Sequence, residues 1–233
     1  KQIQEAMEAS AKAGAMIVVF PELCITGYSC HDLFYQRTLL TQAKAGLLSL
    51  AKKTEDLSGI FFVGLPWEHQ GKLYNVAAAL CGGKVLGLVP KTYLPNYAEF
   101  YEARQFTPGM QEIVNVCLEG QETDIPLGTD QVFRCREIPE LVIASEICDL
   151  WTPCPPSGRH CLHGATLIAN LSASDEVTGK NAYRKDLVAM TSARLYCAYL
   201  YASAGEGEST QDVVYSGHSL IAENGSILVE SDL

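Results

Sequence analysis

The sequence of 233 residues lacks any run approaching about 18 uncharged apolar residues, which excludes a membrane-spanning helix. Basic residues are few, with 17 Lys and Arg against 27 Asp and Glu, and the net charge of −10 disfavours nucleic acid and anionic membranes as partners. No Cys-x-x-Cys pair occurs among the nine cysteines, and a chain of this size does not need disulfides. We therefore predict no nucleic-acid partner, no membrane partner, and mostly buried thiols in a reducing cytoplasm.

Low-complexity linkers and repeats of a fixed period are also absent, which argues against an array of modules. The length suits one large domain or two small ones, and because no linker separates two parts, we predict a single domain over residues 1–233. Apolar residues make up 48% of the chain, which excludes disorder along its whole length and suffices for a sizeable core.

Four residues of metal-binding types lie close together in the sequence: Cys154, His160, Cys161 and His163. Zinc sites favour Cys pairs and His pairs at characteristic short spacings, and these four residues do not follow them. We therefore predict no metal site.

Helical patterns alternate with apolar, β-branched runs along the chain. Helical periodicity covers residues 2–14, 39–53, 158–164 and 184–196, and strands are predicted at 16–20, 59–65, 141–145, 165–170 and 198–202. Hairpins are predicted within 73–89 and 219–229, through Gly82-Gly83 and Asn224-Gly225. This alternation predicts an α/β fold, and the hairpins make its sheets mixed. Residues 107–130 are predicted to be mostly loop, and the charges at 184–186 to form a solvated helix face or ion pairs.

Three reactive residues follow apolar runs that we predict to be strands: Glu22, Lys91 and Cys148. Ligands of α/β sheets bind beyond the carboxyl ends of strands, so these positions suit a site. A thiol is a weak nucleophile until it loses its proton; Glu22 would take that proton, and Lys91 would stabilise an oxyanion. Residue types and spacing alone leave two alternatives open, namely acyl transfer from an amide through a thioester, or a solvated glutamate and a buried thiol without catalysis.

Longer blocks surround these residues, at 21–28, 90–102 and 146–151, and further blocks follow at 155–157, 170–174, 179–180, 199–205, 207–210 and 217–225. Together they extend over essentially the whole chain. They resemble the nitrilase superfamily of carbon–nitrogen hydrolases, and within it the glutaminase domain of glutamine-dependent NAD synthetases.

The resemblance implies a nitrilase-type α-β-β-α sandwich with two mixed sheets, of which the N-terminal strand and the C-terminal end would be missing from this sequence. It implies hydrolysis of L-glutamine to glutamate and ammonia by Cys148, Glu22 and Lys91 through a thioester, without a cofactor. The ammonia would pass to a downstream synthetase domain, not included here, that uses ATP and Mg²⁺ to amidate deamido-NAD to NAD. A cytoplasmic homo-oligomer is expected.

The resemblance also assigns roles around the three reactive residues. Glu99 or Glu102 matches an auxiliary glutamate near the lysine, and we prefer Glu99 because it lies eight residues after Lys91. The residues expected to hold the glutamine head group are Tyr28, Ser174 and Lys180, and those expected to wall the pocket are Tyr97 and Phe100.

One block departs from the family pattern, because Asp149 follows Cys148 where the family has Glu-Asp. We interpret this as a residue omitted from the sequence; the alternative is an altered turn after the nucleophile. Two other functions stay open, namely a free-standing carbon–nitrogen hydrolase acting on another small amide and a catalytically silent, nitrilase-like oligomerisation module.

Overall fold

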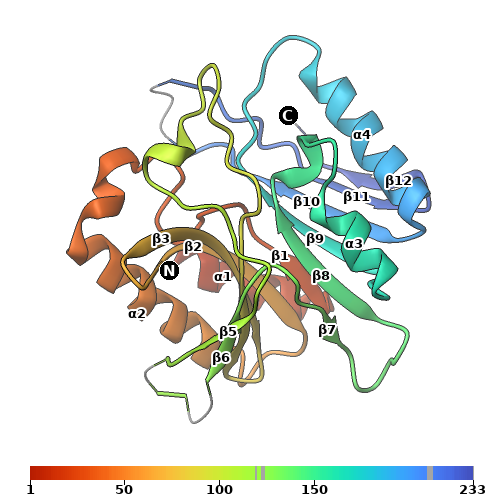
Figure 1. Ribbon diagram of the computed structural model, residues 1–233. Helices are drawn as coiled ribbons and strands as arrows, with labels where there is room; N and C mark the ends of the chain where they lie inside the picture. Colours follow the sequence, from red (N-terminus) through yellow and green to blue (C-terminus); the bar gives the residue numbers. More distant parts are fainter. Residues whose placement is uncertain (119, 122–123, 209–211, 233) are drawn as a thin grey trace.

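The computed structural model describes residues 1–118, 120–121, 124–208 and 212–232. Two six-stranded sheets pack face to face, and helices cover both outer faces (Figure 1). The first sheet has the order β1-β2-β3-β4-β6-β5. Its strands are β1 (Ile17–Val19), β2 (Ile60–His69), β3 (Lys72–Cys81), β4 (Lys84–Pro90), β5 (Val114–Val116) and β6 (Ile125–Leu127).

The second sheet has the order β12-β11-β10-β9-β8-β7. Its strands are β7 (Phe133–Arg134), β8 (Val142–Ile147), β9 (Leu167–Ser172), β10 (Ala198–Ser203), β11 (Leu220–Glu223) and β12 (Ser226–Glu230). Strands β8, β9 and β10 run parallel, whereas the outer pairs are antiparallel. The first sheet also combines both kinds of pairing, so the predicted mixed sheets are present.

The helices form the outer layers of the sandwich. On the first sheet lie α1 (Gln2–Lys12) and α2 (Arg37–Lys53), and on the second lie α3 (Pro156–Leu162) and α4 (Lys180–Leu195) (Figure 1). Short 3-10 helices span His31–Tyr35, Glu102–Arg104 and Asp149–Trp151. Within the described residues, no helix combines the length and apolar character needed to cross a membrane.

Successive side chains of a strand contribute to different hydrophobic layers of the sandwich. In β2, Phe61 and Val63 join the cluster beneath α1 and α2, whereas Phe62 points into the cluster between the two sheets. Side chains alternate between the two faces of a strand, so a continuous apolar run fills two cores at once. The inter-sheet core also contains Ile143 and Leu171 from the second sheet.

Most predicted elements are confirmed within a few residues, including both hairpins, whose turns use residues of positive φ such as Gly83 and Asn224. The continuous apolar run at 16–20 is typical of a strand buried on both faces, but the residues of β1 are half-buried because it lies at the edge of the first sheet. Residues 107–130 contain β5 and β6, which are too short to produce a clear pattern.

Two further expectations hold only in part. Of the two alternatives for the charges at 184–186, ion pairs are present: Arg184 is wholly buried, so it does not lie on a solvated face, and it pairs with Glu176 at 3.0 Å. All nine cysteines are free, as predicted, but most of them are not fully buried: Cys117 and Cys154 are exposed, and Cys148 is among the six that are partly buried.

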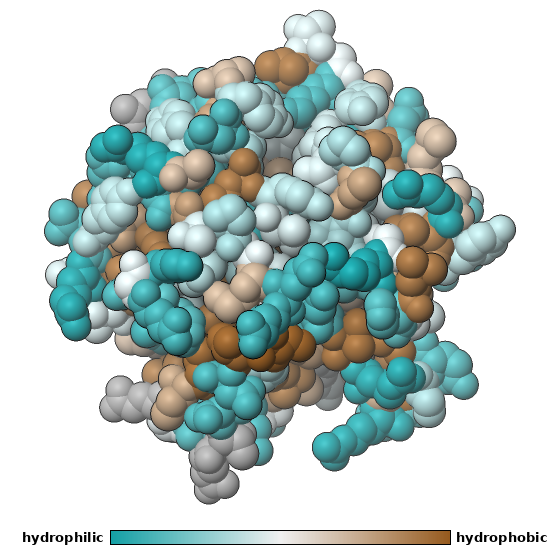
Figure 2. Space-filling model, viewed as in Figure 1, coloured by the Kyte–Doolittle hydropathy of each residue, from teal (hydrophilic) through white to brown (hydrophobic). Residues whose placement is uncertain are grey.

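The surface mixes hydrophilic and hydrophobic residues, with hydrophobic side chains gathered in a band below the centre of the view in Figure 2. The most exposed large apolar side chains on the two outer helices of the second sheet are Leu162 of α3, 88% exposed, and Met190 of α4, 71% exposed. These helices therefore keep apolar surface in contact with solvent.

Candidate active site

The three reactive residues lie beyond the carboxyl ends of three strands, two in the first sheet and one in the second. Glu22 follows β1, Lys91 follows β4 and Cys148 follows β8. Lys91 and Cys148 line one cavity of about 280 Å³, here called the Cys148 pocket. The fold thus brings the loops of both sheets together, as the strand-end argument predicts.

Glu22 is buried in a turn packed tightly on the neighbouring strand. Its backbone N–H donates to the carbonyl of Ser172 in the other sheet at 3.3 Å, and its side chain is 1% exposed. A Cβ at Gly64 of β2 would lie 2.3 Å from the backbone nitrogen of Leu23, so this approach requires glycine. Gly64 therefore fixes where the Glu22 turn sits.

Lys91 is held at both its backbone and its ammonium group. Its N–H donates to the Asn75 carbonyl at 2.8 Å, directly after Pro90 ends β4. Its Nζ donates to Glu22 Oε1 and to Glu102 Oε1, each at 2.7 Å, and the side chain is 2% exposed. An unpaired buried charge is costly, and here the two carboxylates compensate the charge of the buried Lys91 ammonium.

Cys148 occupies a sharp turn between β8 and the helix Asp149–Trp151. Its φ of 55° and ψ of 0° are left-handed, an arrangement that costs a non-glycine residue about 1–3 kcal/mol. Its N–H donates to the Leu171 carbonyl at 3.0 Å. The next residue, Asp149, accepts hydrogen bonds from the backbone N–H groups of Thr92 and Tyr93, at 3.4 and 3.0 Å. The turn is thereby joined to the residues that follow Lys91.

Burial and charge set the protonation states of the three groups. Burial raises the pKa of Glu22 to about 7, although Lys91 opposes the rise. Burial also raises the pKa of the Cys148 thiol to about 12, again opposed by the Lys91 ammonium. Burial lowers the pKa of Lys91, but Glu102 and Glu22 more than offset this and hold it well above its usual value.

Glu22 keeps one acceptor atom available. Asn75 Nδ2 donates to Oε1 at 2.6 Å, as Lys91 does, whereas Oε2 is buried and has no hydrogen-bond partner among the described residues. The arrangement thus contains a neutral thiol, a cation and a carboxylate that titrates near neutral pH. These are the parts needed for general-base activation of a nucleophile.

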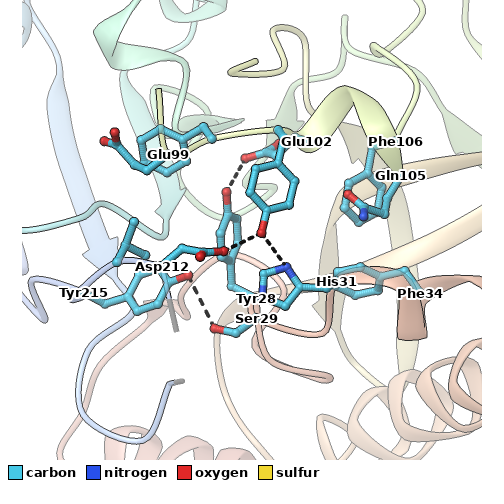
Figure 3. A pocket seen from close by; sticks show the side chains of 13 residues that line it. Tyr28, Ser29, His31, Phe34, Glu99, Glu102, Gln105, Phe106, Asp212 and Tyr215 are labelled. Carbon is cyan, nitrogen blue, oxygen red and sulfur yellow. Dashed lines mark hydrogen bonds between the residues drawn. The ribbon is translucent and has the colours of Figure 1, made fainter. Parts of the chain in front are cut away.

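Glu102, and not Glu99, is the carboxylate that contacts Lys91, so the preference for Glu99 as the glutamate near the lysine is wrong. Glu102 is buried and also accepts a hydrogen bond from Tyr28 Oη at 2.6 Å. Glu99 is exposed and lines a neighbouring cavity, where its carboxylate points away from Glu102 (Figure 3). The eight-residue spacing from Lys91, on which the preference for Glu99 rests, misleads because the intervening loop has no regular period that determines which side chain returns to the lysine.

The structure places all five residues expected around the substrate on the wall of the Cys148 pocket; they are Tyr28, Tyr97, Phe100, Ser174 and Lys180. Lys180 pairs with Asp175, which also lines the pocket, and its Nζ lies 4.9 Å from the centre of the Trp151 ring. The sequence analysis missed Asp175 and Asn75, although Asp175 directly follows the predicted Ser174.

No group of three or more His, Cys, Asp and Glu side chains in the described parts of the chain is arranged to hold a metal ion. Metal independence of the chemistry stays a prediction.

The family model described as "Carbon-nitrogen hydrolase" matches residues 1–233. The glutamine-dependent NAD(+) synthetase of Mycobacterium tuberculosis (strain ATCC 25618 / H37Rv) is 44% identical over 220 residues, which are 94% of this chain and 32% of that protein. The enzyme of the same name from Homo sapiens is 30% identical, over 99% of this chain and 33% of that protein. The chain thus spans about a third of the length of these relatives.

Solved structures agree with these relatives. A glutamine-dependent NAD(+) synthetase from Cytophaga hutchinsonii matches 99% of this chain and 37% of its own with a TM-score of 0.87 and 32% identity. A Nesterenkonia amidase of the nitrilase superfamily matches 99% of this chain and 78% of its own with a TM-score of 0.75 and 19% identity, which supports the fold alone. The predicted nitrilase-type sandwich is confirmed.

Proposed function

Because the chain belongs to the carbon–nitrogen hydrolase family, we propose that it hydrolyses the side-chain amide of L-glutamine to glutamate and ammonia. We further propose that it is the glutaminase domain of a glutamine-dependent NAD synthetase, the name that its relatives carry. The observation that carries the proposal is the contact of Lys91 with Glu22 and Glu102 beside a pocket that contains Cys148.

In the first half-reaction, Cys148 Sγ attacks the amide carbon while Glu22 takes the thiol proton. The Lys91 ammonium stabilises the negative oxygen of the tetrahedral intermediate. Glu22 then gives its proton to the nitrogen, the C–N bond breaks, and ammonia leaves a γ-glutamyl thioester on Cys148. A base with a pKa of about 7 suits this role, since it can both accept and return a proton at neutral pH.

In the second half-reaction, water attacks the thioester carbon and Glu22 takes a proton from the water. The C–S bond breaks, Cys148 leaves and recovers its proton, and glutamate is released. One water is consumed for each glutamine, and neither half-reaction needs a cofactor or a metal.

The five wall residues bind the substrate in this proposal. Tyr28, Ser174 and Lys180 hold the glutamine head group, and Tyr97 and Phe100 provide apolar walls. Tyr28 has a second role, because its hydroxyl donates to the same Glu102 oxygen that contacts Lys91. Binding and chemistry therefore share one network.

The ammonia then passes to a synthetase domain that uses ATP and Mg²⁺ to convert deamido-NAD to NAD in a cytoplasmic homo-oligomer. The relatives' names support this product, and their greater length leaves room for such a domain. Exposed Leu162 and Met190 offer apolar surface for oligomer formation.

Isotope transfer tests the proposal. The full-length protein receives glutamine labelled with ¹⁵N in its side-chain amide, together with ATP, Mg²⁺ and deamido-NAD. We expect the parent to form labelled NAD. We expect the Cys148→Ala variant to form NAD only when free ammonium is added. Unlabelled NAD, or labelled NAD from the variant with glutamine, would contradict the proposal.

A further inference from the structure

Tyr28 joins the wall of the Cys148 pocket to the carboxylates around Lys91. Its side chain lines that pocket, and its hydroxyl points at Glu102 and donates to Oε1 at 2.6 Å (Figure 3). The same Glu102 oxygen accepts a hydrogen bond from Lys91 Nζ at 2.7 Å. Burial and the Glu102 carboxylate raise the pKa of Tyr28 well above its usual value, so the hydroxyl keeps its proton and stays a donor. The position of Tyr28 therefore affects the oxygen that binds the Lys91 ammonium.

The backbone that carries Tyr28 is irregular, because it lies between β1 and the 3-10 helix His31–Tyr35. Two residues of this segment have positive φ, Leu23 at 52° and Gly27 at 91°. Such a backbone does not form the regular hydrogen-bond pattern of a helix or a strand, so its N–H groups need other acceptors. The group that accepts from the Tyr28 N–H therefore helps to fix where the side chain lies.

Glu208, 180 residues further along the chain, provides that acceptor. Its Oε1 accepts a hydrogen bond from the Tyr28 N–H at 2.8 Å. Its Oε2 accepts from the Ser29 N–H at 3.3 Å and from the Ser29 hydroxyl at 2.9 Å. Hydrogen bonds to an ionised carboxylate are stronger than those between neutral groups. The loop after β10 therefore holds the backbone on both sides of the peptide bond that follows Tyr28.

We propose that Glu208 is a positioning residue for glutamine hydrolysis, which acts through Tyr28 on the contact between Glu102 and Lys91. This inference rests on the proposed glutaminase function and adds a residue from the loop after β10 to the catalytic network. Glu208 lies outside the described lining of the Cys148 pocket, so it acts without touching the substrate. Removing its charge weakens three hydrogen bonds at once, and the Tyr28 hydroxyl is then no longer held on Glu102.

A double-mutant cycle in the full-length protein separates this role from a merely structural one. Tyr28→Phe is expected to lose about 10- to 100-fold in kcat/KM for glutamine, since a hydrogen bond to a carboxylate is lost. Glu208→Gln is expected to lose about 10-fold in the parent. In the Tyr28→Phe background the same substitution should cost less than about twofold, because the hydroxyl that Glu208 positions is already absent.

The matched control is Glu206→Gln, which removes an exposed carboxylate from the same loop and should stay within about twofold of the parent. Melting temperatures show whether each variant is folded. A Glu208→Gln loss of equal size in both backgrounds would overturn the inference, since Glu208 would then act independently of Tyr28. Parental activity of Glu208→Gln would overturn it as well.

Alkylation of Cys148 by iodoacetamide, followed by the mass of its peptide, gives the same cycle without turnover of glutamine. The Lys91 ammonium opposes the rise in the pKa of the thiol, so the reactivity of Cys148 depends on the Glu102–Lys91 contact. We expect the same coupling between Glu208 and Tyr28 in the alkylation rate. Independent losses there would overturn the inference, whereas coupled losses in a parent that releases no ammonia from glutamine would support it and overturn only the proposed function.

Discussion

Glu22 is the residue whose protonation controls the proposed chemistry. It acts as a base only when ionised, and burial raises its pKa to about 7. We therefore predict that kcat/KM for glutamine falls as the pH drops through about 7, because the protonated carboxyl cannot accept the Cys148 proton. A pH–rate profile of the full-length protein measures this directly.

The Glu22→Gln variant, which keeps the shape of the side chain, is expected to lose about 100- to 10,000-fold in kcat/KM. Its circular dichroism and melting temperature serve as the folding control. A profile that stays flat through neutral pH, or a variant of near-parental activity, would show that another group is the base.

Glu102 and Glu99 give a contrast between a buried and an exposed carboxylate in one loop. Glu102→Gln removes one of the two negative charges on the Lys91 ammonium, and we predict a loss of about 10- to 100-fold, mainly in kcat. Glu99→Gln is expected to stay within about twofold of the parent, as exposed substitutions usually do. Steady-state kinetics with glutamine measure both, and a larger loss in Glu99→Gln would refute the assignment.

The individual residues of the site were predictable where they directly follow a strand. Glu22, Lys91 and Cys148 each stand at such a position, and their residue types limited the chemistry. Asn75 and Glu102 could not be found in the same way, because they reach Glu22 and Lys91 only through the folded chain.

Among the elements, the turn after β1 depends on a close approach to β2. A methyl group at Gly64 would clash with the Leu23 backbone, so Gly64→Ala should displace the Glu22 turn. We predict destabilisation of about 1–3 kcal/mol, the usual cost of overpacking, together with loss of glutaminase activity. Urea unfolding and glutamate release test the two effects.

Gly158→Ala is the matched control. Apart from the neighbouring residues and backbone of α3 itself, no atom lies within 4 Å of a Cβ at this position. Alanine also favours a helix over glycine, so this variant should be as stable as the parent or more so. Equal stability of the two glycine variants would contradict the role of Gly64.

Helix α4 is joined to the pocket wall by Arg184. The guanidinium contacts Glu176 and the Asp175 carbonyl, so Arg184→Met should destabilise the protein by about 3 kcal/mol and raise KM for glutamine. Lys185→Met, which breaks an exposed pair with Glu230, should cost less than about 1 kcal/mol. Urea unfolding measures the free energy of unfolding of both variants. Equal destabilisation by the two substitutions would show that the buried contacts of Arg184 stabilise the protein no more than an exposed ion pair does.

The sequence pattern predicted the helices and strands that have clear periodicity. It failed where the burial of a residue depends on tertiary packing and where a strand is very short. The pattern at Arg184 is that of an exposed helix face, and its burial follows from tertiary packing against the 174–176 segment and His218. Strands β5 and β6 have three residues each, too few for a recognisable period.

In the molecule as a whole, the site lies where the two sheets meet. The Glu22 N–H donates to the Ser172 carbonyl of the opposite sheet, and Cys148 follows a strand of the second sheet whereas Lys91 follows a strand of the first. The α-β-β-α order could be expected only from the family resemblance, since the alternation of elements predicts an α/β fold without its layers. Activity should therefore depend on both sheets being intact.

In the proposed mechanism, glutamine hydrolysis needs no metal. We predict that excess EDTA leaves glutamate release unchanged while it stops NAD formation, because the proposed Mg²⁺ requirement belongs to the synthetase domain. Both products are measured in the same reaction. Loss of glutamate release that Mg²⁺ or Zn²⁺ restores would contradict the metal-free mechanism.

Glutamate and ammonia release from L-glutamine tests the central claim most directly, in the full-length protein and in its Cys148→Ala and Cys154→Ala variants. Cys154 is an exposed thiol shortly after the Cys148 turn and serves as the matched control. We predict release by the parent and by Cys154→Ala, and none by a folded Cys148→Ala protein. Release that survives in Cys148→Ala would contradict the assignment of the nucleophile.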